Sequence, residues 1–171
     1  SIAALAGFAP HTVSIAIRWS SGANPFITIA ESLSLGVWVS VLLLLLVQLA
    51  NRAVRAVGVL VMPVAFVLVG WAATLRTAPA GEIVPALQSG WLWVHIVGAS
   101  VGFSAVLVAA GLALLFLFKQ GRVGGIADRL PSPDALDNLS YRFVVGGFTM
   151  YGVMIVSGAF WANQVKGNFW N

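Results

Sequence analysis

The stretch WLWVHIVGASVGFSAVLVAAGLALLFLFK, residues 91–119, decides the fold because it is a nearly uninterrupted apolar run of membrane-spanning length. A helix needs about 20 mostly apolar residues to cross the hydrocarbon core of a bilayer, and the only strongly polar side chain before the final lysine is His95. At helical spacing Trp91, His95, Gly98 and Gly102 share one face. We therefore expect a membrane helix with a histidine near one end and room beside it for a flat ligand or a neighbouring helix.

Two interpretations of His95 follow from its position in this run. In the first, its imidazole faces the aqueous side and serves as an axial ligand. In the second, it is an interfacial histidine that is hydrogen-bonded to a neighbouring helix. Taken alone, the residues favour the second interpretation, because single histidines in membrane helices often only hold packing together.

The composition excludes several classes of protein. The chain has 171 residues, of which 60% are hydrophobic and 8% are charged, so it is not a soluble globular domain. It has no cysteine, which excludes a thiolate metal site, a disulfide and a cysteine nucleophile. The first 19 residues lack the basic region that begins a cleavable signal peptide, so we expect none.

The pattern of apolar runs predicts an all-α, polytopic integral membrane helix bundle with about five transmembrane helices in a single domain, residues 1–171. The short gaps between the runs predict antiparallel neighbours. We expect a cytoplasmic loop at residues 119–139 and an extracytoplasmic aromatic tail at residues 163–171. The five spans are expected at about residues 1–19, 27–49, 57–74, 91–118 and 141–162.

The positions of the basic residues predict an orientation. The net charge of +4 comes mostly from short loops between the spans, which indicates membrane topology and not a nucleic-acid site. One side of the five-span arrangement collects six basic residues, and the positive-inside rule places that side in the cytoplasm. His95, Glu31 and five of the seven tryptophans then lie at the extracytoplasmic face. The six basic residues are Arg52, Arg55, Lys119, Arg122, Arg129 and Arg142; the opposite side has Arg18, Arg76 and Lys166.

Other polar or sulfur-containing side chains in the spans are expected to be structural. Glu31 lies about one turn inside the second span and needs a partner or a proton there, and Arg18 is the nearest candidate partner in the sequence. His11 is expected to hydrogen-bond a nearby backbone carbonyl. Met62 is expected to fill the core and not to ligate haem.

Four segments, in order along the chain, carry a family resemblance. They are RWSSGANPFITIAESLSLGVW (18–38), ALQSGWLWVHIVGASVGFSAVL (86–107), LDNLSYRFVVGGFTMYGVMIVSGAFWAN (136–163) and KGNFWN (166–171). They resemble the N-terminal part of the CcsA/ResC-type cytochrome c assembly proteins, which belong to a haem-handling superfamily with CcmC and CcmF. The last segment is similar to the opening of that family's tryptophan-rich signature.

The resemblance implies a function and a set of site residues. His95 matches the first of two external histidines that ligate haem, so it is the candidate ligand of the haem iron. Trp161, Phe169 and Trp170 match aromatics that help to bind the porphyrin, and Trp91 shares the helix face of His95. The family implies that haem b is bound transiently outside the membrane and presented for attachment to apocytochrome c. It also implies a CcsB/ResB-like membrane partner, a role in a cytochrome c haem lyase or synthase system, and a bacterial cytoplasmic membrane or a thylakoid-type membrane.

The chain also departs from the family pattern. Ala23, Thr28, Ala30 and Lys166 replace His, Asn, Tyr and Trp of many relatives, and the given sequence contains neither the W-D-P-K-E continuation nor the second external histidine. Two interpretations therefore stay open. The chain is either one piece of a haem-presenting protein or a shortened, non-catalytic relative that acts as a structural subunit of a larger membrane complex.

Overall fold

The computed structural model describes residues 2–22, 28–51, 55–75, 88–122 and 124–169. These residues form five α-helices and include the 3-10 helix at residues 127–129, and the described part of the chain contains no strand. The predicted all-α fold class is therefore confirmed. The helices are α1 (Ile2–Ser20), α2 (Ile29–Ala50), α3 (Val57–Thr74), α4 (Gly90–Lys119) and α5 (Pro133–Lys166), with the 3-10 helix η3 (Ala127–Arg129) before α5.

Four of these helices, α2 to α5, are long and apolar enough to cross a membrane, with mean hydropathies from 1.7 to 2.5. The chain is thus a multi-pass membrane protein. Helix α1 has 19 residues and is not one of the four; Pro10, His11 and Arg18 reduce its apolar character. Its role as a first span and the orientation of the bundle in the bilayer stay predictions.

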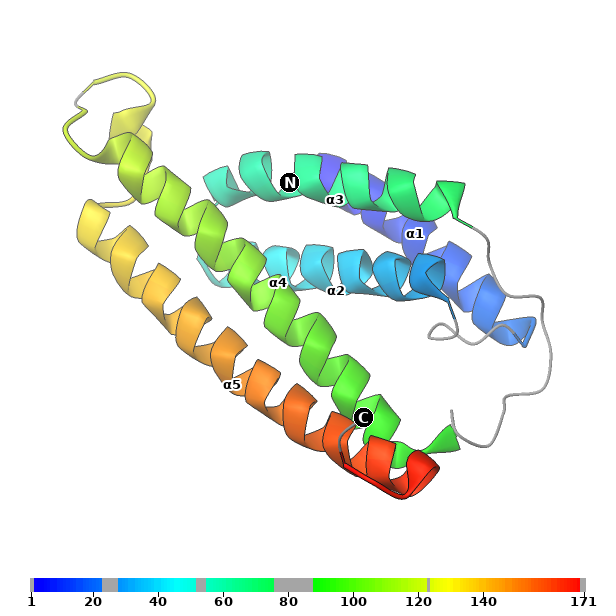
Figure 1. Ribbon diagram of the computed structural model, residues 1–171. Coiled ribbons are helices and arrows are strands. Elements are labelled where there is room, and N and C mark those ends of the chain that lie inside the picture. Colours follow the sequence, from blue (N-terminus) through cyan, green and yellow to red (C-terminus); the bar gives the residue numbers. More distant parts are fainter. Residues whose placement is uncertain (1, 23–27, 52–54, 76–87, 123, 170–171) are drawn as a thin grey trace.

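Helix α4 occupies the centre of the bundle. It has its largest interface with α5 and also contacts α2 and α3, whereas α1 packs mainly on α2. In Figure 1 the pair α4 and α5 crosses α2 and α3 at an oblique angle. A core cluster that includes Leu44, Val61 and Leu112 joins α2, α3 and α4. Met62 packs against this cluster and against a second one, as predicted for a core residue.

Three glycines allow α4 and α5 to approach closely. A Cβ atom added at Gly98 would lie 3.1 Å from the carbonyl oxygen of Met150, and one added at Gly102 would lie 3.3 Å from the carbonyl oxygen of Gly147. A Cβ atom added at Gly147 would lie 3.2 Å from the carbonyl oxygen of Gly102. Membrane helices associate through such close backbone packing because the hydrophobic effect does not drive their association in lipid, so van der Waals contacts must.

The bounds of α5 differ from the expected span of residues 141–162. The helix begins at Pro133 because the Ser132 hydroxyl accepts a hydrogen bond from the backbone N–H of Ala135 and proline suits the first helical position. It ends at Lys166, where Gly167 adopts a φ of 78° that favours glycine at a helix terminus. The loop before α5 is therefore shorter than predicted, and part of the expected tail is helical.

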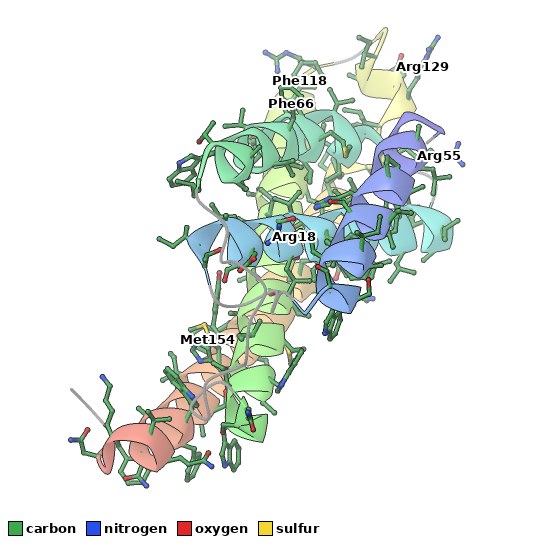
Figure 2. All side chains as sticks on the ribbon, turned by 90° about the vertical axis from the view of Figure 1, so that its right-hand side faces the viewer. Arg18, Arg55, Phe66, Phe118, Arg129 and Met154 are labelled. Carbon is green, nitrogen blue, oxygen red and sulfur yellow. The ribbon has the colours of Figure 1, made fainter. Side chains whose placement is uncertain are left out.

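The two ends of the bundle differ in character. Figure 2 shows Arg55 and Arg129 at the same end, with Met154 towards the other. At the opposite end Trp19 of α1 stacks on Trp93 of α4, with ring centroids 5.9 Å apart. We call this the aromatic end; it contains the ends of α1, α3 and α5 and the beginnings of α2 and α4. Arg52 and Arg76, which also enter the charge argument, lie outside the described residues.

A buried hydrogen bond between Ser40 of α2 and Ser104 of α4 joins the two halves of the bundle. Their hydroxyl oxygens are 2.9 Å apart, and both side chains are buried. Such hydrogen bonds between membrane helices contribute about 0.6 kcal/mol on average. We expect a double-mutant cycle of Ser40→Ala and Ser104→Ala to give a coupling free energy near that value in detergent unfolding experiments. Strictly additive effects would show that the hydrogen bond does not stabilise the fold.

Candidate functional site

His95 lies in the first two turns of α4 and is held by α5. Its Nδ1 atom is 2.7 Å from the backbone carbonyl oxygen of Met154. The ring lies directly against Gly158, where an added Cβ atom would be 2.6 Å from Nδ1 and 2.9 Å from Cε1. The packing interpretation of His95 predicted a hydrogen bond to a neighbouring helix, and this contact confirms it.

The same hydrogen bond determines where the proton of the neutral ring lies. A carbonyl oxygen can only accept, so Nδ1 must be the donor, and the lone pair of the neutral imidazole is then on Nε2. Histidines that ligate metals usually donate their other ring N–H to a carbonyl or carboxylate in this way. The contact with Met154 therefore leaves His95 competent to ligate a metal through Nε2, and the packing and ligand interpretations are compatible.

His95 lines a cavity of about 600 Å³ between α2 and α4. Most of the lining is apolar and includes Phe103, and the hydroxyl-bearing residues Thr28, Ser32 and Ser100 also line it. Small-molecule sites are typically cavities of this size with a few polar groups among apolar walls. A neutral imidazole beside apolar walls suits haem, which is a flat apolar ring around an iron that binds imidazole. The residues present therefore fit this group.

Two of the predicted aromatic residues, Trp91 and Phe169, belong to a separate cluster at the aromatic end. Trp91 of α4 stacks on Phe160 of α5, with ring centroids 4.7 Å apart and an interplanar angle of 22°. Phe169 packs edge-on against Phe160 at 5.9 Å. Trp161 follows Phe160 on α5 and is partly buried. Trp170 lies outside the described residues.

The structure brings some predicted site residues together and not others. Phe160 joins Trp91 to Phe169. Trp91 and Phe160 border a hollow between α4 and α5 that is distinct from the cavity lined by His95. The α2–α4 cavity is lined by none of Trp91, Trp161 and Phe169. Phe160 was missed in the sequence analysis, although it directly precedes Trp161 in the matched segment 136–163 and so had a signal.

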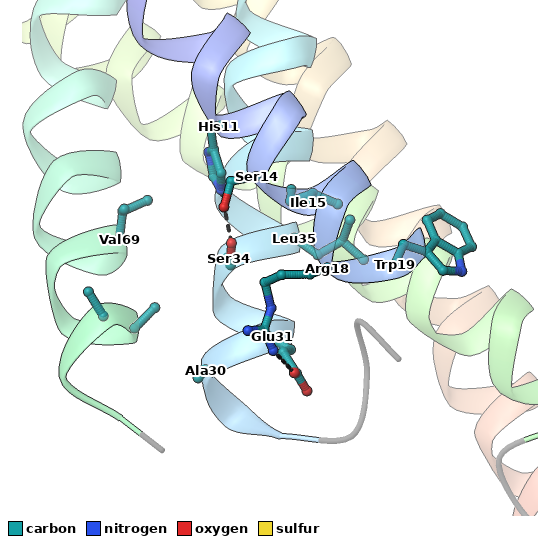
Figure 3. Close-up of a pocket in the computed structure, with 12 residues that line it drawn as sticks. His11, Ser14, Ile15, Arg18, Trp19, Ala30, Glu31, Ser34, Leu35 and Val69 are labelled. Atoms are coloured by element: carbon teal, nitrogen blue, oxygen red, sulfur yellow. Dashed lines mark hydrogen bonds and ion pairs between the residues drawn. The ribbon is translucent and has the colours of Figure 1, made fainter. Parts of the chain in front are cut away.

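A cluster of polar side chains lies between α1 and α2, around a cavity of about 230 Å³. Arg18 and Glu31 form the predicted ion pair, and Glu31 is buried whereas Arg18 is 39% exposed. Glu31 also accepts hydrogen bonds from the backbone N–H and hydroxyl of Thr28, which caps α2. Figure 3 shows His11 and Arg18 pointing from α1 towards α2. This arrangement satisfies the buried carboxylate, as predicted for a structural pair.

The partner of His11 differs from the prediction. Its Nε2 atom is 2.9 Å from the hydroxyl oxygen of Ser34 and does not bond a backbone carbonyl. The Ser34 hydroxyl can both donate and accept a hydrogen bond, so it can pair with either tautomer of the His11 ring. His11 and His95 line different cavities, and the described residues contain no group of three or more metal-ligating side chains.

The fold and this site define a multi-pass helical membrane protein in which His95, hydrogen-bonded to α5, lines an apolar cavity, with an aromatic cluster at the same end. The family model described as "Cytochrome C assembly protein" matches residues 26–171. The chain belongs to the cytochrome c assembly protein family.

Individual relatives support the same assignment. The chain is 31% identical to "Cytochrome c biogenesis protein CcsA" of Synechococcus sp. (strain CC9902), over 94% of this chain and 62% of the relative. It is 33% identical to the protein of the same description from Parasynechococcus marenigrum (strain WH8102), over 90% of this chain and 59% of the relative. For the Chlamydomonas reinhardtii protein the identity is 30%, over 91% of this chain and 46% of the relative. The chain thus spans about half to three fifths of these relatives, and no solved structure matches it.

Proposed function

We propose that this chain handles haem in cytochrome c biogenesis, binding haem b transiently at the aromatic end and presenting it for attachment to apocytochrome c. The observation that carries the proposal is the hydrogen bond from His95 Nδ1 to the Met154 carbonyl, which leaves Nε2 free to ligate iron beside an apolar cavity. Family membership supplies the biological setting. The aromatic end lies outside the membrane in this proposal, and the opposite end, with Arg55 and Arg129, lies in the cytoplasm.

Each site residue has a distinct part in the proposed binding. His95 holds the iron, and the apolar walls of the cavity between α2 and α4 exclude water from one side of the porphyrin ring. Trp91 and Phe169, linked by Phe160, supply further aromatic surface at the same end. Trp161 and Trp170 are further proposed contacts of the porphyrin. When bound, haem supplies the iron centre and the vinyl groups to which cysteine thiols of an apocytochrome become attached.

The proposed setting includes partners that this chain does not contain. A CcsB/ResB-like membrane protein is the proposed companion, and apocytochrome c with its Cys-x-x-Cys-His motif is the acceptor. The proposed location is a bacterial cytoplasmic membrane or a thylakoid-type membrane. As part of such an assembly the chain contributes binding and orientation to a haem lyase or synthase system, while the reactive groups belong to haem and the acceptor thiols.

A reduced-minus-oxidised absorbance spectrum of the detergent-purified protein tests this function. We expect a b-type haem signal in the wild type and a signal at least about tenfold weaker in His95→Ala, because even the residues that orient metal ligands affect affinity by about tenfold or more. His11→Ala is the matched control, since it removes the other histidine, which lines the α1–α2 cavity. The control is expected to retain the signal.

The structural-subunit alternative predicts a different spectrum. It draws on the close α4–α5 packing and on the fact that His95 is fully compatible with a packing role. Under this alternative, wild-type protein expressed with ample haem and with a CcsB/ResB-like partner carries no haem. That result would overturn the haem-handling proposal for this chain.

A further inference from the structure

The contact between the His95 ring and Gly158 is the tightest that any glycine within the five α-helices makes. An ideal Cβ atom at Gly158 would be 2.6 Å from Nδ1, whereas the next closest approach of this kind is 2.9 Å, between Gly111 and Val57. Real Cβ atoms essentially never approach a heavy atom as closely as 2.6 Å. Any side chain at position 158 therefore requires the imidazole to move.

The ring is located by α5 from two sides. Gly158 leaves the space that the Nδ1 and Cε1 edge of the ring occupies, and the carbonyl oxygen of Met154, one turn earlier on α5, accepts the Nδ1 hydrogen. That carbonyl can accept this bond in addition to its helical bond because an amide oxygen has two lone pairs. The Ser157 hydroxyl also lies 3.1 Å from the same oxygen, but it is closer to the Val153 carbonyl oxygen, at 2.6 Å. One contact restricts where the ring lies, and the other restricts which nitrogen carries the proton.

We propose that Gly158 and the Met154 carbonyl are the positioning elements of His95, and that they hold it with Nδ1 protonated and with the Nε2 lone pair free on the side away from α5. The claim that these two groups position a ligand rests on the proposed function, in which His95 ligates haem iron. The tautomer and the ring position are properties of the haem-free protein. The two parts can therefore be tested separately.

The first test is nitrogen NMR of haem-free protein labelled with ¹⁵N-histidine. The chain has two histidines, so His11→Gln leaves His95 as the only labelled ring, and glutamine can still hydrogen-bond Ser34. At alkaline pH, which keeps the imidazole neutral, we expect one nitrogen resonance typical of a protonated ring nitrogen, assigned to Nδ1, and one typical of an unprotonated nitrogen, assigned to Nε2. A spectrum with Nε2 protonated, or with the two tautomers averaged, overturns the inference.

The second test replaces Gly158 by alanine in the same background. We expect the single tautomer to be lost, because the added methyl group displaces Nδ1 from the Met154 carbonyl. We also expect the haem content to fall at least about tenfold, as for other residues that orient metal ligands. Gly102→Ala is the matched packing control: its Cβ would meet the same helix 3.3 Å from the Gly147 carbonyl oxygen and 3.3 Å from Tyr151 Cδ1, at positions that precede Met154 on α5.

The outcomes distinguish the inference from the proposed function. Loss of the single tautomer in Gly158→Ala but not in Gly102→Ala supports positioning by Gly158, and equal changes in both variants overturn it. A single Nδ1-protonated tautomer in wild-type protein that binds no haem supports the positioning and overturns the function. Haem that depends on His95 in a protein whose Nε2 is protonated supports the function and overturns the positioning. If Gly158→Ala does not fold, the spectrum of the His11→Gln protein alone still decides the tautomer.

Discussion

Replacing Gly147 by leucine is expected to separate α4 from α5 and to lower the free energy of unfolding by about 3 kcal/mol, at the upper end of the usual overpacking range. Already its Cβ atom would lie 3.1 Å from Val106 Cγ2, 3.2 Å from the Gly102 carbonyl oxygen and 3.3 Å from Ala105 Cβ. Two of these neighbours are backbone or Cβ atoms that cannot rotate away. The remaining carbons of leucine have no space in this interface.

Gly146→Leu is the matched control for this prediction. Gly146 is the adjacent residue on the exposed face of α5, and an added Cβ there would meet nothing within 4 Å. The two variants add the same atoms to the same helix, and they differ in the face that receives them. Unfolding by titration with SDS in mixed detergent micelles measures the difference. Equal stability of the two proteins would show that the close α4–α5 packing does not contribute to the fold.

The sequence predicts the helices well because their formation depends on local properties. Apolar runs of membrane-spanning length and short gaps are sufficient to place α2, α3 and α4. The early start of α5 was missed because hydropathy marks the apolar segment, whereas Ser132 and Pro133 determine where the helix begins. The cap lies in the polar stretch that was assigned to a loop.

Contacts between helices were predictable only where a physical necessity limited the choices. A carboxylate buried at Glu31 requires a cation, and Arg18 was the nearest one, so their pairing could be inferred. The Ser34 partner of His11 and the role of Gly158 depend on how neighbouring helices are rotated, which the sequence does not reveal. The same holds for the α2–α4 cavity, because Trp91 and His95 share a helix face yet border different hollows.

Removal of Arg18 is expected to destabilise the protein more than neutralisation of its partner. In Arg18→Ala the Glu31 carboxylate, which is only 5% exposed, keeps its hydrogen bonds from Thr28 but loses its counter-ion. Leaving a buried charge unpaired in this way costs about 3 kcal/mol or more. In Glu31→Gln the remaining charge is that of Arg18, which is 39% exposed and can be hydrated, and glutamine can still accept from Thr28. We expect a loss of about 1 kcal/mol there.

The double variant Arg18→Ala/Glu31→Gln separates the charge from the contacts. If the large effect of Arg18→Ala arises from an unpaired carboxylate, then removing the negative charge as well must restore part of the lost stability. The double variant should therefore unfold at a higher SDS fraction than Arg18→Ala alone, even though it lacks both members of the ion pair. If the effects of the two single substitutions simply add in the double variant, the contribution of Arg18 arises from its packing against α2. Arg18 would then not be needed to compensate the charge of the buried Glu31 carboxylate.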